Sequence, residues 1–133
     1  MRFAPVPFAL AALFLALPGA AEAQRGSFRG DAHPTRGSAR IVEVDGQRFL
    51  ELDASFRTDG GPDLKVVLHR QANPRSYGRG QYRSLGRLRR VAGSQRYRLP
   101  AGLDLSRFRS VVIWCEEFDV TFGHAVLNRA SPP

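Results

Sequence analysis

The chain has 133 residues, of which 43% are hydrophobic and nine are Phe, and this composition predicts one packed domain rather than a disordered chain. The formal net charge is +8, and every basic residue except Lys65 is an arginine. Such a charge can attract nucleic acid, anionic lipid or acidic polysaccharide. Cys115 is the only cysteine, which excludes an intramolecular disulfide.

The N-terminus has the pattern of a secretory signal peptide. Met1 and Arg2 give a short positive start, residues 8–17 are almost wholly apolar, and Ala21–Ala23 form an A-x-A cleavage signature. The apolar run is about half of the roughly 20 residues that a spanning helix needs. We therefore predict cleavage between Ala23 and Gln24 and a secreted or periplasmic protein that does not span the membrane. Export argues against nucleic acid as a physiological partner.

The remaining chain shows the pattern of short strands separated by turns. Asp45-Gly46 predicts a tight hairpin turn, and alternation of apolar and polar residues over 49–56 predicts a strand with one buried face. Further strands are expected at 64–68, 85–91, 95–99, 111–115 and 118–127. The continuous apolar run over 111–115 predicts that this strand is the central one. We expect a long exposed loop over 71–83, a single helical turn at 103–108 and a C-terminal tail over 128–133.

This order of elements predicts an all-β fold. About seven to nine short strands with frequent turns and no long amphipathic helix are typical of an antiparallel β-sandwich or barrel. The pattern leaves open whether a sandwich or a barrel forms, and it does not fix the order in which the strands pair.

A set of short motifs occurs in order along the chain: Gly26–Phe28 with His33 and Gly37; Gly61–Leu64 with Val67-Leu68; Leu85-Gly86 with Leu88; Gly93, Gln95, Tyr97, Leu99 and Pro100; Asp104-Leu105 with Phe108; Ser110–Cys115; and Phe118, Val120, Phe122-Gly123, Ala125 and Leu127. This order of motifs resembles the DM-thirteen domain family, which is described as an electron-transfer domain and is associated with DOMON domains. The resemblance covers one domain, residues 24–127. It implies an all-β fold, a redox role and a characteristic cysteine at Cys115, acting either as a thiol or as a ligand to a prosthetic group.

Three interpretations of Cys115 remain open at the level of the sequence. Cys115 can be a redox thiol or a ligand, a small buried hydrophobe, or one half of an intermolecular disulfide. It follows an apolar run and precedes Glu116 and Glu117, and these acidic neighbours disfavour the thiolate form that a nucleophile needs. We therefore expect slow reaction with thiol reagents and assign no catalytic residue.

Histidines are the other candidates for redox chemistry. Haem or a metal ion, neither of which the sequence requires, would draw its ligands from Cys115, His33, His69 and His124. Strand periodicity predicts that His124 shares a face with Phe122, beside the core, whereas His69 ends a strand and is expected to be exposed. We regard His33 and His124 as the assisting or ligating candidates. No metal-type spacing links these residues.

The arginine-rich segment provides the alternative function. Arg75, Arg79 and Arg83 are interleaved with Tyr77 and Tyr82, and arginine binds carboxylates and phosphates through paired hydrogen bonds. The first hypothesis is an accessory redox domain that meets an envelope redox protein. The alternative is a non-catalytic module that binds an anionic envelope component or a protein through these arginines, with the cysteine only packing.

Overall fold

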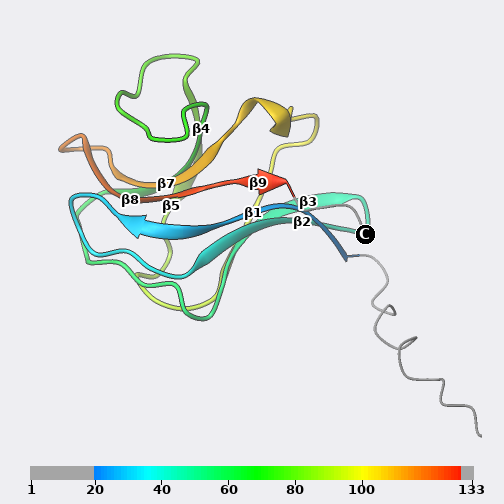
Figure 1. Ribbon diagram of the computed structural model, residues 1–133, viewed down its shortest axis with the longest axis horizontal. Coiled ribbons are helices and arrows are strands. Elements are labelled where there is room, and N and C mark those ends of the chain that lie inside the picture. Colours follow the sequence, from blue (N-terminus) through cyan, green and yellow to red (C-terminus); the bar gives the residue numbers. More distant parts are fainter. Residues whose placement is uncertain (1–19, 130–133) are drawn as a thin grey trace, which may run out of the picture.

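The computed structural model describes residues 20–129 and shows an all-β domain (Figure 1). Its strands are β1 (Ala20–Gly30), β2 (Ser38–Val44), β3 (Gln47–Leu52), β4 (Leu64–His69), β5 (Tyr82–Arg87), β6 (Gln95–Arg98), β7 (Ser110–Cys115), β8 (Val120–Val126) and β9 (Asn128–Arg129). The one helical segment of this region is a 3₁₀ turn, η2 (Leu105–Arg107), within the stretch where a helical turn was predicted. The region holds no helix that is long and apolar enough to cross a membrane.

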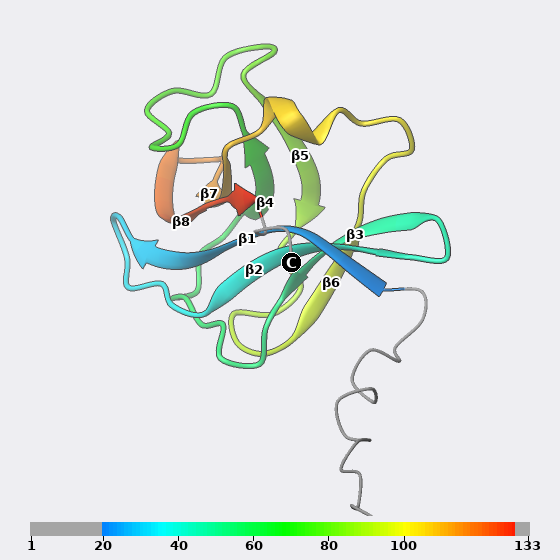
Figure 2. The same ribbon diagram turned by 45° about the vertical axis from the view of Figure 1, so that its right-hand side comes forward.

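All strands belong to one antiparallel sheet that curls into a nearly closed barrel (Figure 2). Eight strands follow each other in the order β5-β4-β7-β8-β1-β2-β3-β6, and β9 pairs with β1 beside this path. The all-β prediction is therefore confirmed, and the architecture resembles a barrel more than two separate layers. β7 has a neighbour on each side and all six of its residues are buried, which confirms its predicted central position.

The β2–β3 hairpin forms where the sequence predicted it. Asp45 and Gly46 connect the two strands with φ angles of 51° and 81°, and two successive positive φ angles define the turn that matches strand twist. Leu50 and Leu52 point into the barrel and are buried. The second arm is shorter than predicted, because a turn at Ala54 and Ser55 ends the alternation and leaves Ala54 exposed.

β1 is the element that the sequence pattern did not reveal. It pairs along Ala20–Ser27 with β2 and then along Phe28–Gly30 with β8, so it joins the two halves of the sheet. At the change of partner Gly26 passes so close to β8 that an added Cβ would lie 1.9 Å from the carbonyl oxygen of Val126. Only glycine permits such an approach, and glycine weakens the strand pattern in the sequence.

Several predicted boundaries shift. β5 begins at Tyr82 and ends at Arg87, so the strand predicted over 85–91 starts three residues earlier and ends before the turn at Gly93. Asn128 and Arg129, the first residues of the predicted tail, pair with β1 as β9. The predicted signal peptide lies outside the described residues except for 20–23, and residues 130–133 lie outside them as well.

Candidate functional site

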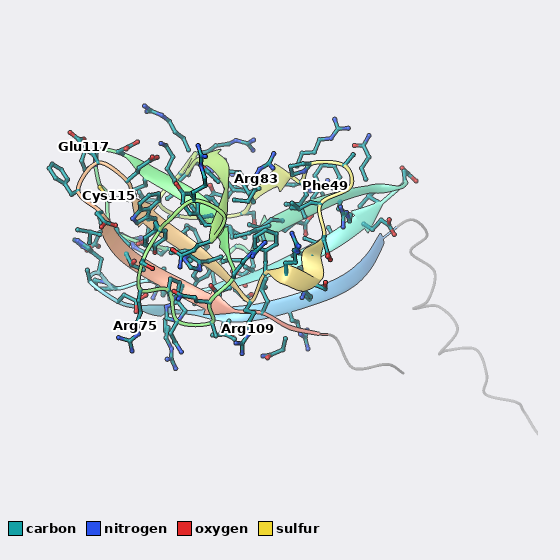
Figure 3. The ribbon with its side chains drawn as sticks, turned by 90° about the horizontal axis from the view of Figure 1, so that it is seen from above. Phe49, Arg75, Arg83, Arg109, Cys115 and Glu117 are labelled. Atoms are coloured by element: carbon teal, nitrogen blue, oxygen red, sulfur yellow. The ribbon has the colours of Figure 1, made fainter. Side chains whose placement is uncertain are left out.

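Cys115 ends β7 with its side chain inside the barrel. It is 1% exposed, belongs to the main apolar core, and lies opposite Leu64 of β4 and Val120 of β8. Figure 3 shows it at the end of the barrel where the β7–β8 turn lies. The thiol is therefore screened from solvent and from partner proteins while the barrel stays closed.

The acidic residues after Cys115 turn away from it. Glu116 and Glu117 begin the exposed β7–β8 turn, and Glu116 accepts a hydrogen bond from the Lys65 ammonium at 2.8 Å. Lys65 also pairs with Asp63 at 3.2 Å. Phe118 at the tip of the turn is 63% exposed. The carboxylates that the sequence places beside the thiol thus belong to the surface of the molecule.

A bulge in β8 changes which residues share a face. Ile113 pairs with Gly123 but the next residue, Trp114, pairs with Thr121, so Phe122 is an extra residue in β8. Phe122 points into the core, whereas His124 lies opposite Val112 on the outer side of the sheet. The prediction that His124 shares a face with Phe122 is therefore wrong.

The outer side of β4, β7 and β8 carries a second buried cluster, which we call the outer cluster. Val67, Val112 and Trp114 form its floor, and the partly buried Tyr77 and Tyr82 pack against them. The ring of Tyr77 stacks on Trp114 with a centroid distance of 4.1 Å and an interplanar angle of 9°. This cluster is a site that the sequence interpretation missed, because Tyr77 was assigned to a solvated loop.

Segment 70–81 covers the outer cluster and is anchored to it by its own polar groups. The Ser110 hydroxyl donates to the Gln71 carbonyl at 2.7 Å, and the Tyr77 hydroxyl lies 2.6 Å from the Thr121 hydroxyl. Figure 1 shows this segment, in green, rising beyond β4. The prediction of a loop is correct, but the loop is held to the sheet rather than merely solvated.

His69 is fully buried at 0% exposure, so the prediction of an exposed His69 is wrong. Its Nδ1 accepts the backbone N–H of Gln71 at 2.9 Å, which leaves Nε2 protonated to donate to the Ser76 carbonyl at 2.8 Å. Burial lowers the pKa of His69 below its ordinary value, although the hydrogen bond to Ser76 opposes this shift. The neutral ring is thus built into the fold of segment 70–81.

His124 lies under the same segment. Its Nδ1 donates to the Asp31 carboxylate at 2.7 Å, and its Nε2 lies 3.1 Å from the side-chain oxygen of Asn73. The ring is almost fully buried, whereas the Asp31 side chain is about one third exposed. His124 thereby ties the end of β1 and segment 70–81 to β8.

His33 occupies a different place from both His124 and Cys115. Its ring stacks on Phe122 at a centroid distance of 3.7 Å, and Nδ1 lies 2.9 Å from an Asp59 carboxylate oxygen. The structure thus places Cys115 inside the barrel, His124 on its outer side, and His33 at the surface.

The candidate cysteine and histidines are not arranged as the ligands of one metal ion. Within residues 20–129, no group of three or more His, Cys, Asp or Glu side chains is arranged to hold a metal ion. Cys115 and His124 lie on opposite faces of the sheet, so the two do not converge on one point.

The predicted anion-binding arginines are exposed but spread over the surface. Arg75 and Arg79 belong to segment 70–81 and Arg83 to β5. Figure 3 shows Arg75 and Arg83 on opposite sides of the view, so they do not form one cluster.

Other arginines are neutralised within the sheet. Arg40 and Arg96 both bind Glu51 across β2, β3 and β6. Partial burial raises the pKa of Glu51, but the hydrogen bonds from Arg96 and Arg40 outweigh burial and lower it below its usual range. The carboxylate of Glu51 therefore neutralises part of the positive charge on this surface.

A family model described as "Electron transfer DM13" matches residues 27–127, which include Cys115 and the whole outer cluster. No curated protein and no solved structure matches the chain.

Proposed function

The chain belongs to the Electron transfer DM13 family, and on that premise we propose that it is an exported accessory domain whose electron transfer centres on Cys115. The family match over residues 27–127 is the observation that carries the proposal. Cys115 is the only cysteine of the chain and lies within the matched region. We propose an envelope redox protein as its partner.

The surroundings of Cys115 favour a thiol that acts by itself over one that shares a cofactor with histidine. His124 faces the outer side of the sheet, and the ring of His33 packs on Phe122. Cys115 is 1% exposed, which disfavours a disulfide with a second protein because the two sulfur atoms would have to touch. Electron exchange through the protein needs no such contact. In the proposed role Cys115 gives one electron to the partner and its S–H proton to solvent, which leaves a thiyl radical, and return of one electron and one proton restores the thiol.

Export is part of the proposal and rests on the N-terminal sequence pattern. Cleavage after Ala23 would leave Gln24–Ser27 paired with β2, because the register irregularity of β1 lies between Glu22 and Gln24. Gln24 and Arg25 would also keep their pairing with β9. The proposed mature chain therefore retains the strand that joins the two halves of the sheet.

The test is voltammetry of the protein purified from the exported fraction, with its N-terminus read by mass spectrometry. We expect an N-terminus at Gln24 and a reversible redox wave that is lost in Cys115→Ala. Cys115→Ser is the matched control, because it keeps a side chain of similar size without the sulfur, and it should also lack the wave. Equal waves in the wild type and in both folded variants would overturn the role of Cys115.

A further inference from the structure

Three aromatic rings of the outer cluster contact one another, and one of them belongs to Trp114, the residue before Cys115. Trp114 is 5% exposed, Tyr77 stacks on it at 4.1 Å, and the Tyr82 ring meets it edge-on at a centroid distance of 5.3 Å. Tyr77 and Tyr82 are partly exposed and also touch each other, with ring centroids 5.7 Å apart. The rings thus connect a buried indole to the molecular surface through van der Waals contact.

Trp114 also has a proton acceptor. Its indole Nε1–H donates to the Asp119 carboxylate at 3.0 Å. Asp119 has a φ of 52°, an angle that non-glycine residues rarely adopt, and its backbone N–H donates to the Glu116 carbonyl at 3.2 Å. The tight β7–β8 turn therefore fixes the carboxylate next to the indole.

The position of Trp114 links the outer cluster to the interior. Trp114 and Cys115 are consecutive residues of β7, so their side chains point to opposite faces of the sheet. Cys115 cannot touch a partner protein in the closed barrel, whereas the rings stacked on Trp114 reach the surface. An electron path between the interior and the surface can therefore pass through Trp114.

We propose an electron and proton relay formed by Trp114, Tyr77 and Asp119. In this relay Trp114 passes one electron through the Tyr77 ring to a one-electron metal-centre oxidant at the surface. The indole proton of Trp114 passes to Asp119. This inference rests on the proposed electron-transfer function. The described interactions supply each part of the relay, namely the ring stack, the hydrogen bond and the adjacency to Cys115.

The step balances in charge and in atoms. The indole N–H bond breaks, an O–H bond forms on Asp119, and the metal centre is reduced by one electron. Trp114 becomes a neutral radical and Asp119 a neutral acid, so no uncompensated positive charge remains on the buried ring. Return of one electron to the indole and of the proton from Asp119 restores the starting state.

Tyr77 contributes its ring and keeps its phenolic proton. Burial raises the pKa of Tyr77 to about 12, although the hydrogen bond with Thr121 opposes this shift. The hydroxyl group is therefore not the proton acceptor of the relay, and the stacked contact is what the electron path requires of Tyr77.

The experiment is flash-quench oxidation with photogenerated ruthenium(III) tris-bipyridine, followed by transient absorption of the mature protein. Trp114 is the only tryptophan, so a tryptophanyl signal has one source. We expect the neutral tryptophanyl radical in the wild type and in Cys115→Ala, and no tryptophanyl radical in Trp114→Phe. Persistence in Cys115→Ala separates the relay from the redox role of Cys115, which voltammetry tests.

Two pairs of variants test the parts of the relay. Asp119→Asn keeps a hydrogen-bond acceptor and a residue type that tolerates positive φ, but the amide does not take the proton, so the radical should persist as the cation. Tyr77→Leu should slow oxidation by about tenfold or more, equivalent to about 1.4 kcal/mol of barrier, whereas Tyr77→Phe, which keeps the ring, should not. Near-ultraviolet circular dichroism checks that each variant is folded.

Two results would overturn the relay. One is deprotonation of the oxidised indole at the same rate in the wild type and in folded Asp119→Asn. The other is equal oxidation rates in Tyr77→Leu and Tyr77→Phe, because the stacked ring would then carry no electron. Either result would leave the outer cluster with a packing role only. The voltammetry of Cys115 would still test the proposed function independently of the relay.

Discussion

His69 is a buried, neutral imidazole, and its protonation would disturb the fold. Both ring nitrogens bond to backbone groups of segment 70–81, one as acceptor from Gln71 and the other as donor to Ser76. Protonation of Nδ1 would turn the acceptor into a donor that faces the N–H of Gln71. The folded state therefore excludes the second proton more strongly than the unfolded chain does.

Acid should weaken the domain through His69. The pKa of His69 is lowered on folding from an ordinary value of 6.5, so below that pH the unfolded chain binds a proton that the folded state does not. Its contribution to stability is complete above pH 6.5 and is lost as the pH falls toward the lower folded pKa, by at most about 1.4 kcal/mol per pH unit. Urea unfolding across this range measures the effect.

The matched control for this titration is His69→Gln, whose side chain carries both an acceptor and a donor and does not titrate. The difference between the two stability curves isolates the contribution of His69 from that of all other groups. Parallel curves in the wild type and His69→Gln between pH 7 and the acid limit of folding would contradict the role assigned to His69.

Single residues also mark where the sequence could and could not be interpreted. The Asp45-Gly46 turn follows from local backbone preference, which depends only on neighbouring residues. The burial of Cys115 agrees with its place in a continuous apolar run, although the sequence left three interpretations of this residue open. The burial of His69 could not be predicted, because it results from the return of segment 70–81 over the sheet. A polar residue at the end of a strand gives no sequence signal that the segment after it will fold back and bury it.

At the level of elements, β1 and β8 depend on close approaches that a side chain would prevent. Gly26 of β1 lies against the carbonyl of Val126, and Gly123 of β8 lies against Thr35, where an added Cβ would be 2.4 Å from the side chain. β1 changes partner next to Gly26. The bend of the sheet into a barrel thus depends on small residues at the junction.

Substitution of Gly26 by alanine should therefore destabilise the fold strongly. The added Cβ would fall 1.9 Å from the backbone oxygen of Val126, and backbone cannot move aside as a flexible side chain can. We expect Gly26→Ala to lower the free energy of unfolding by about 3 kcal/mol or more, measured by urea unfolding.

Gly60→Ala provides the control for this experiment. Nothing lies within 4 Å of a Cβ built at Gly60, and its φ is not in the left-handed region. A change of less than about 0.5 kcal/mol is expected there. A similarly small change in Gly26→Ala would mean that β1 and β8 can separate at this junction without cost.

The same elements explain why the order of strands could not be predicted. Most strands are recognisable from a few residues, although β1 and β9 are not, and the bulge at Phe122 reverses the periodicity of β8 in mid-strand. The bulge moves His124 to the outer side of the sheet, where its ring meets Asn73 of segment 70–81. The position of the bulge depends on how β8 pairs with β7, so no pattern within β8 alone indicates where the bulge lies.

For the whole molecule, Cys115 reports on the opening of the barrel. Its side chain belongs to the core that all the main strands share, so a thiol reagent can reach it only when this core opens. We expect native labelling to be slower than labelling of the urea-unfolded protein by roughly a thousandfold or more, as a stability of about 5 kcal/mol implies. Mass spectrometry of alkylated samples over time measures both rates.

Labelling that rises in parallel with the unfolded fraction as urea is added would support this interpretation. Labelling at the rate of an exposed thiol in the absence of urea would contradict it, because Cys115 is only 1% exposed in the closed barrel. The same measurement shows whether a partner could ever reach the sulfur directly without unfolding the domain.

The pairing of β1 with β8 and β9 also sets the order in which the chain can fold. β1 is the earliest strand to be synthesised among the described residues, yet two of its partners, β8 and β9, are the last. Such contacts between distant parts of a chain form late and slow folding. Until residues 120–129 have emerged, one edge of β1 has no strand to pair with. The barrel is thus completed by β8 and β9, the last strands among the described residues.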